Sequence, residues 1–242
     1  MKRLTIVFLL ILQATTILKA QEVVNKTEKW RIGVSMGTGY LMASTKETAK
    51  AFEQLGVEYD KAKKGVDKLK WQLQFGGDVH YLFQSGWGIG LKYQYAQSDG
   101  NINDLVINMN GDGLTNVVGD INFKYLINYI GPSFFTKSKI GNNRRLFFTG
   151  LFSMGYSHLR IEQTTLDYPL LGTSSSAGLF ASLGLEYYLK QYVSLGCDLG
   201  VFGSSFKKIK YNNGYDTWKT DLGDSSDNIS NLNLSFNIRF YL

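Results

Sequence analysis

The chain has 242 residues, of which 44% are hydrophobic, 14% aromatic and 19% charged, and its formal net charge is +6. Only 2 prolines stand against 26 glycines, which together with the many aromatic residues favours a β-rich chain. The single cysteine, Cys197, excludes an intrachain disulfide framework and a multi-cysteine metal site.

The N-terminus has the pattern of a secretory signal peptide, which we predict over residues 1–20. Lys2 and Arg3 precede a short apolar run, and cleavage is expected near Ala20. The run is too short for a membrane-spanning helix, which needs about 20 apolar residues. Three basic residues and no acid lie in this segment, so half of the net charge belongs to it, and a nucleic-acid partner is not expected.

Residues 21–29 are polar and predict a periplasmic lead-in to the first strand, residues 30–42, where apolar and polar residues alternate. The next segment, 44–70, breaks this alternation. Its apolar residues follow the 3-4 spacing that marks one side of a helix: Phe52, Leu55, Tyr59, Ala62, Val66 and Leu69. Gly65 weakens this helical pattern. We expect the helical segment to pack over the rim of its own domain, with a partner-binding surface as the alternative.

Seven further segments return to a period of two residues, which predicts strands. They are residues 71–83, 87–98, 120–137, 144–162, 177–189, 192–210 and 231–242. The connections alternate in length, with long loops at 44–70, 99–119, 163–176 and 211–229. About eight strands with alternating short and long connections are therefore expected.

Each predicted strand has one apolar-aromatic face and one face of glycine, polar or charged residues. In 120–137, Ile121, Phe123, Tyr125, Ile127 and Tyr129 form the apolar set, opposite Asn122, Lys124, Leu126 and Asn128. In the last strand, Leu232, Leu234, Phe236, Ile238, Phe240 and Leu242 oppose a polar face that includes Arg239 and Tyr241. Tryptophan and tyrosine gather near strand ends, as in an interfacial aromatic girdle.

This polarity predicts an all-β protein: a closed, antiparallel, up-and-down transmembrane β-barrel of about eight strands, occupying residues 30–242. The apolar faces meet lipid and the polar faces fill a narrow interior. A soluble barrel would have the opposite polarity.

The leader, the alternation of loop lengths and the final strand ending in Phe240, Tyr241 and Leu242 resemble a small eight-stranded outer-membrane β-barrel protein of the OmpA/OmpX-like, porin-family type. The resemblance covers essentially the whole mature chain. It implies location in the outer membrane of a Gram-negative bacterium, both termini in the periplasm and the long loops outside the cell. It also implies recognition of the C-terminal strand by the barrel-assembly machinery, although Leu242 stands where that family usually has an aromatic residue.

The inward polar faces predict a charge network in the lumen. Its members are Arg31, Asp78, His80, Lys92, Lys124, Glu186, Asp198 and Arg239. An eight-stranded barrel is only wide enough for side chains, so these charges are expected to pair and to close the interior. A narrow conducting path is the alternative.

No cofactor or catalytic residue is expected. Ser157, His158 and Glu162 cluster in sequence, but adjacent strand residues point to opposite faces, which is poor geometry for a nucleophile and its base. Asn108, Asn110 and Asp112 faintly resemble the start of a calcium loop, yet position 12 of that pattern is Gly119 rather than an acid. The acids Asp216, Asp221, Asp224 and Asp227 in the last loop are interpreted as solvated turn residues. Cys197 is expected to face lipid.

The sequence therefore predicts a non-enzymatic outer-membrane barrel that acts as an envelope scaffold or a surface-binding protein. Its expected partners are outer-membrane lipid, the assembly machinery and, at the long loops, an extracellular ligand or protein that the sequence does not name. A small passive pore and a secreted soluble β-barrel that binds an apolar ligand are the alternatives.

Overall fold

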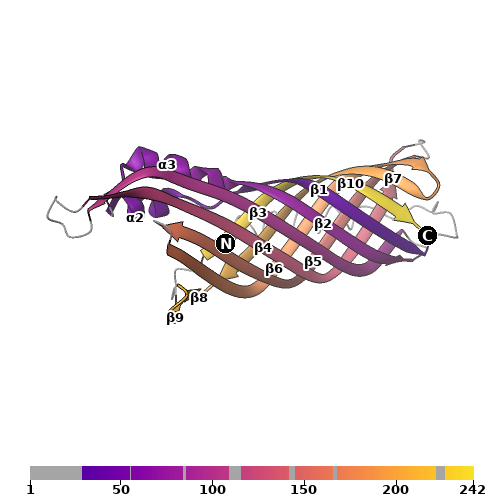
Figure 1. Cartoon of the computed structure of the whole chain (residues 1–242). Coiled ribbons are helices and arrows are strands. Elements are labelled where there is room, and N and C mark those ends of the chain that lie inside the picture. Colours follow the sequence, from indigo (N-terminus) through magenta and orange to yellow (C-terminus); the bar gives the residue numbers. More distant parts are fainter. Residues whose placement is uncertain are drawn as a thin grey trace.

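The computed structural model describes residues 29–54, 56–83, 86–108, 116–141, 145–165, 168–221 and 227–242. The predicted signal peptide lies outside these residues. Within them, ten strands form one antiparallel sheet in the order β5-β4-β3-β2-β1-β10-β7-β6-β8-β9, and β5 also pairs with β6. That last pairing closes all strands except β8 and β9 into a barrel of eight, as predicted (Figure 1).

The elements have the following bounds: β1 Trp30–Leu41, α2 Lys46–Gln54, α3 Tyr59–Asp67, the 3-10 turn η1 Lys68–Lys70, β2 Trp71–Leu82, β3 Trp87–Asn108, β4 Asn116–Lys139, β5 Leu146–Thr165, β6 Tyr168–Lys190, β7 Val193–Phe206, β8 Lys208–Asn212, β9 Thr217–Asp221 and β10 Asp227–Tyr241. We call the end with the β2–β3, β4–β5 and β6–β7 connections and the C-terminus the turn end. The opposite end, with α2, α3, β8 and β9, is the loop end (Figure 1).

The first and last barrel strands close the wall, as the sequence predicts for 231–242. β10 runs antiparallel to β1 from the Arg31–Tyr241 pair to the Leu41–Asn231 pair. The amide of Trp30 donates to the carbonyl of Leu242 at 2.9 Å, which extends the pairing to the last residue. In the part of the wall nearest the turn end, closure leaves no free edge among the described barrel strands, as a lipid environment requires.

The outer surface of the barrel near the turn end is a belt of exposed apolar side chains. On β10 the predicted lipid-facing residues all point outward, from Leu234 at 42% exposure to Phe236 at 67%. Cys197 is also exposed on this side. An apolar exterior of this extent rules out the alternative of a soluble barrel and fits strands that cross a membrane.

Aromatic rings border the belt on both sides. Near the turn end, Trp87 stacks on Phe83 with ring centroids 4.2 Å apart. Toward the loop end, Tyr40 and Trp71 meet edge to face at 5.2 Å. Such girdles are typical of the two membrane–water interfaces.

The polarity of the wall reverses between the belt and the loop end, and β4 carries the reversal most clearly. In the part of β4 near the turn end, Ile130 and Phe134 are exposed while Ser133 and Lys137 are buried. In the part toward the loop end the same inward face is apolar: Ile121, Phe123, Ile127 and Tyr129 are buried. The prediction that this apolar set faces lipid is therefore wrong. Beyond the belt, water surrounds the wall, so the barrel there buries apolar residues like a soluble one.

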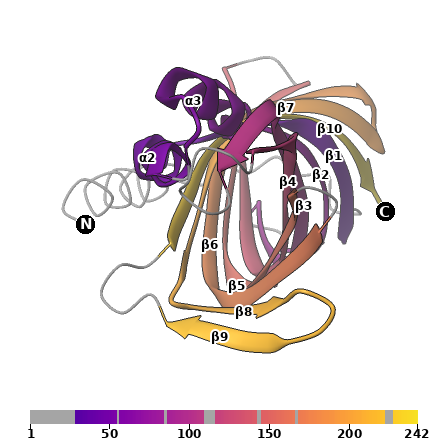
Figure 2. The same ribbon diagram turned by 60° about the vertical axis from the view of Figure 1, so that its left-hand side comes forward.

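Two of the predicted long loops are largely strand. β3 continues to Asn108, β4 begins at Asn116, β5 reaches Thr165 and β6 begins at Tyr168. β4 alone has 24 residues, against about 9–11 needed to cross the hydrocarbon. Part of the last predicted loop forms the β8–β9 hairpin, which continues the sheet outward from β6 (Figure 2). The barrel therefore rises well above the membrane.

The helical segment packs against the inward face of the raised β3–β4 wall, as the local-packing prediction has it. Phe52 of α2 stacks on Phe123 with ring centroids 5.8 Å apart. Ala62 and Val66 of α3 are buried in the same cluster, together with Ile102 of β3. Neither helix of the described chain is long and apolar enough to cross a membrane.

Gly65 permits the close approach of α3 to β3. A Cβ atom at this position would lie 2.6 Å from the backbone oxygen of Asn101 and 2.4 Å from the Ile102 side chain. Alanine is ordinarily the better helix former by about 1 kcal/mol. We expect Gly65→Ala to loosen the helical segment despite this propensity, with faster proteolysis of residues 43–70. Lys64→Ala, at an exposed position of the same helix, is the control; slower cleavage of Gly65→Ala would contradict the packing argument.

Asp67 anchors the end of α3. Its carboxylate accepts hydrogen bonds from the Thr45 hydroxyl at 2.5 Å and from Lys63 at 2.9 Å, and it pairs with Lys70 at 2.9 Å. These partners, Thr45 first, hold the pKa of Asp67 well below its ordinary value.

A carboxyl with a depressed pKa stabilises the fold above its ordinary pKa of about 4, and this contribution is lost as the pH falls toward the folded-state pKa. We therefore expect the protection of the α2 and α3 amides against hydrogen exchange, measured relative to the intrinsic exchange rate at the same pH, to fall below about pH 4. Asp67→Asn should show fast exchange already at pH 7, whereas the exposed Asp60→Asn should match the wild type. Equal exchange in both variants at pH 7 would contradict the anchoring role.

Candidate functional site

Inward side chains at the turn end form a layer of charged and polar groups, which we call the charge layer. Its members are Arg31, Asp78, His80, Lys92, Ser133, Lys137, Glu186, Tyr188, Ser194, Asp198, Arg239 and Tyr241. They come from every barrel strand except β5, because alternate residues of each strand point into the lumen. Most of them are buried.

One cluster of the charge layer joins β1, β2 and β4. Arg31 is fully buried and forms an ion pair with Asp78. The Arg31 Nη1 atom lies 3.0 Å from His80 Nδ1, and His80 Nε2 lies 2.8 Å from the Ser133 hydroxyl. The guanidinium carbon is 4.0 Å from the centre of the Phe135 ring.

Ser133, His80 and Asp78 follow each other in the order of a catalytic triad, because His80 Nδ1 also lies 3.1 Å from the Asp78 carboxylate. Nδ1 thus faces both a donor, the Arg31 guanidinium, and an acceptor, so these contacts do not fix which ring nitrogen carries the proton. Arg31 and His80 are 0% exposed and Ser133 is 7% exposed, which leaves little surface that a substrate could reach.

A second cluster joins β6, β7 and β10 around Arg239. Its guanidinium donates to Glu186 at 2.9 Å and to Asp198 at 2.5 Å. Glu186 also accepts from the hydroxyls of Ser194 and Tyr241, both at 2.5 Å. Three donors from two strands, β7 and β10, thus meet at the buried carboxylate of Glu186.

Lys137 of β4 extends the layer toward the chain end. Its ammonium group donates to the Tyr188 hydroxyl at 2.7 Å and lies 4.3 Å from the centre of the Tyr241 ring. Such a buried ammonium gains both a hydrogen bond and cation–π attraction.

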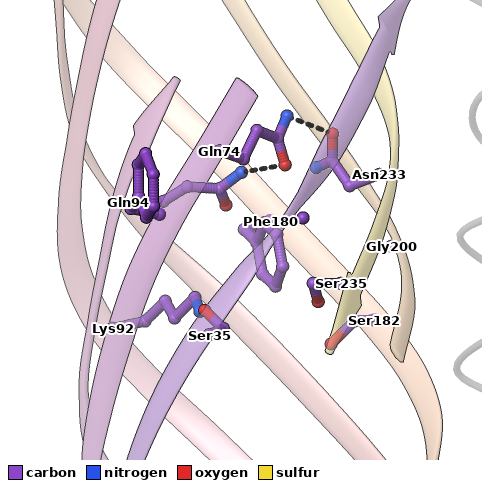
Figure 3. Close-up of a pocket in the computed structure, with 11 residues that line it drawn as sticks. Ser35, Gln74, Lys92, Gln94, Phe180, Ser182, Gly200, Asn233 and Ser235 are labelled. Carbon is purple, nitrogen blue, oxygen red and sulfur yellow. Dashed lines mark hydrogen bonds between the residues drawn. The ribbon is translucent and has the colours of Figure 1, made fainter. Parts of the chain in front are cut away.

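Above the charge layer lies a small polar cavity that Lys92 lines (Figure 3). Gln94 donates to Gln74 at 3.0 Å, and Gln74 donates to Asn233 at 2.7 Å. The ring of Phe180 bounds the cavity, 5.2 Å from the Lys92 nitrogen. The cavity measures about 10 Å³, room for about one water molecule.

An apolar layer, which we call the plug, fills the lumen beyond this cavity. Its buried members are Leu41, Ala96, Ile127, Tyr129, Leu151, Leu159, Ile161, Phe180, Phe202, Phe206, Ile209 and Ile229. Tyr129 and Phe202 meet edge to face at 5.5 Å, and the Tyr129 hydroxyl reaches Ser153 at 2.6 Å. Side chains therefore fill the lumen in two successive layers.

The structure brings together seven of the eight residues predicted for the lumen. Lys124 is the exception: it lies on the outward face of β4, opposite Glu162 of β5 and Asp99 of β3. The prediction that Lys124 lies in the lumen is wrong, because it assumed that the apolar set on the opposite face of β4 points outward. Above the belt that apolar set points inward, so Lys124 points outward. The sequence reasoning missed Ser133 and Lys137, although both share the inward alternation with Gly131.

The other candidate residues do not form a site. Ser157 is buried, while His158 points outward and contacts the Ser175 hydroxyl at 3.0 Å, so the predicted opposition of the two side chains is confirmed. Asn108 of the calcium-like stretch is the last residue of β3, whereas Asn110, Asp112 and Asp224 lie outside the described residues. In the described part of the chain, no three His, Cys, Asp or Glu side chains gather closely enough to hold a metal ion.

No protein-family model matches the chain, and no curated protein matches it. Solved structures with similar folds include the outer membrane protease OmpT from Escherichia coli, with 8% identity and a TM-score of 0.49 over 92% of this chain and 100% of that chain. OprG from Pseudomonas aeruginosa matches with 14% identity and a TM-score of 0.43 over 89% and 98% of the two chains. Ail of Yersinia pestis matches with 15% identity and a TM-score of 0.38 over 88% and 97%. The values are low, so the closed strand order and the apolar exterior carry the conclusion: the chain is a membrane-spanning β-barrel of the outer-membrane type, as predicted.

We expect Arg239→Ala to destabilise the barrel because it leaves Glu186 and Asp198 buried without their cation. Breaking a buried pair in this way costs about 3–5 kcal/mol. The melting temperature in detergent, followed by the heat-modifiable gel shift, should fall strongly.

Arg160→Ala removes an exposed arginine paired with Glu162 at 2.7 Å and should cost at most about 1 kcal/mol. Adding Glu186→Gln to Arg239→Ala should recover part of the loss, since one uncompensated charge is removed. An unchanged melting temperature in Arg239→Ala would contradict the proposed network.

Proposed function

We propose that the protein is a closed, non-enzymatic scaffold that spans the outer membrane and presents a folded surface beyond it. The observation that carries this proposal is the filling of the lumen by two layers in series, the charge layer and the plug. A lumen filled in this way offers neither a continuous water path nor room for a substrate. The burial of His80 and Ser133, which are 0% and 7% exposed, also speaks against catalysis at Ser133.

The architecture of the loop end supports a presenting role. The raised β3–β6 wall, the helices α2 and α3 and the β8–β9 hairpin form a packed body rather than four separate loops. A packed body holds its exposed groups in fixed positions, which lowers the entropic cost of binding a ligand or protein there. We therefore assign contact with extracellular partners to this end.

We also propose that the C-terminal strand is the segment that the barrel-assembly machinery reads, as the resemblance implies. β10 keeps its alternation to the end, with Phe240 and Leu242 exposed on the lipid side. It ends at the turn end, beside the start of β1.

A small passive pore is the second candidate, favoured by the polar cavity around Lys92. Conductance in planar bilayers separates the two candidates. For the closed scaffold we expect no discrete current steps from the wild type. Steps in the wild type would overturn closure and favour the pore.

Two layers in series make a sharper prediction. Phe180→Ala with Phe202→Ala opens the plug alone, and Arg239→Ala with Glu186→Ala opens the charge layer alone. We expect neither double variant to conduct, and the combined four-residue variant to conduct, provided that the gel shift reports a folded barrel. Phe236→Ala with Leu234→Ala, on the lipid side, is the matched control and should stay silent.

A further inference from the structure

A row of basic residues crosses the outer face of the wall at the loop end. Arg160 of β5 pairs with Thr173 of β6, Thr173 pairs with Lys210 of β8, and Lys210 pairs with Lys219 of β9. Directly paired residues of neighbouring antiparallel strands point to the same face of a sheet. Arg160 shares the outward face of β5 with the exposed Tyr156 and Met154, so the whole row points away from the lumen.

This row differs from the rows next to it by having no acid. In the row farther from the membrane, Asp99, Lys124 and Glu162 alternate in sign and neutralise one another. On the other side, Lys208 pairs with Asp221 at 3.4 Å. Arg160 has a contact to Glu162, but Lys210 and Lys219 have no ion pair among the described residues, so the row keeps a net positive charge.

The level of the row relative to the membrane follows from β5. Tyr156 is the last ring of the belt on this strand, and its hydroxyl donates to Ser175 at 2.6 Å. Arg160 lies four residues farther along the same strand, or about 13 Å along a tilted strand. The row therefore stands just beyond the aromatic girdle, within reach of lipid headgroups for side chains as long as arginine and lysine.

The two lysines are held by a hairpin that is anchored in the barrel. Ile209, the residue directly before Lys210 on β8, is 1% exposed and belongs to the plug. Tyr211 stacks on Trp218 with ring centroids 5.8 Å apart, and the Thr173 hydroxyl contacts the carbonyl of Lys210 at 3.5 Å. Lys210 and Lys219 stand on adjacent strands, about 5 Å apart.

We propose that Arg160, Lys210 and Lys219 form a binding site for the phosphate group of a membrane lipid. Arginine and lysine are the side chains that bind phosphate oxygens most strongly. The acyl chains of the lipid would lie on the apolar belt below, against Tyr156 and Leu179, which are exposed there. A lipid satisfies both surfaces at once, whereas a free anion uses only the upper one. The inference goes beyond the scaffold role and does not depend on whether the lumen conducts.

The test compares two probes that differ only in phosphate, dioleoyl phosphatidic acid and dioleoylglycerol, on the folded barrel in a non-ionic detergent. Native mass spectrometry counts the bound lipid, and the titration gives the affinity. We expect phosphatidic acid to bind at least about tenfold more tightly than dioleoylglycerol. Lys210→Gln with Lys219→Gln should remove about tenfold of this affinity.

Lys46→Gln with Lys64→Gln is the matched control, because it removes the same charge from exposed positions on the helices at the same end. The control should bind phosphatidic acid like the wild type. If the hairpin variant does not show the folded gel shift, Lys219→Gln alone replaces it, since Lys219 is exposed on the outermost strand.

Three results would overturn the proposal. An equal loss of affinity in the helix control would show that only the net charge of the protein matters. Equally tight binding of dioleoylglycerol would show that the phosphate group does not contribute to binding. Inorganic phosphate that binds to the row as tightly as phosphatidic acid would make it a site for a free anion.

Discussion

The width of an eight-stranded barrel governs this molecule. A lumen that holds side chains and little else makes every inward polar atom depend on a partner inside the wall. Arg239 binds two acids from two neighbouring strands, and Arg31 binds an acid on the next strand, although the buried Nε atom of each arginine has no hydrogen-bond partner among the described residues. Because these arginines stand on the first and last barrel strands, the charge pairing and the closure of the wall occur in the same place.

The outer surface of the barrel wall meets two different environments along its length. In the belt, lipid outside requires apolar side chains, and the polar residues turn inward to pair. Above the belt, water outside accepts polar residues such as Arg160, and the apolar residues turn inward to form the plug. The inward face of β4 therefore changes from Lys137 and Ser133 to Tyr129 and Ile127 without any break in its alternation.

This reversal of polarity along the wall explains which parts of the structure could be predicted from the sequence. Alternation fixed the strands and the faces wherever a strand lies in the belt, as in β10, and seven lumen residues followed from it. Alternation cannot tell which face is inside, so one rule for the whole chain misplaced Lys124 and the apolar set of β4. The raised strand ends and the β8–β9 hairpin stayed hidden, because polar outward residues between glycines and asparagines resemble a solvated loop.

The β9 strand shows why a charge row belongs on this part of the surface. β8 and β9 extend the sheet beyond the closed barrel, and among the described strands β9 pairs only with β8, so its outer edge could add a strand from another molecule. Lysine at an edge discourages such pairing, and Lys219 meets that need by itself. Edge protection does not require Lys210 on the inner strand or Arg160 three strands away, nor the absence of acids between them. Alignment of all three side chains in one register, at the margin of the belt, is what a bound phosphate lipid accounts for and edge protection does not.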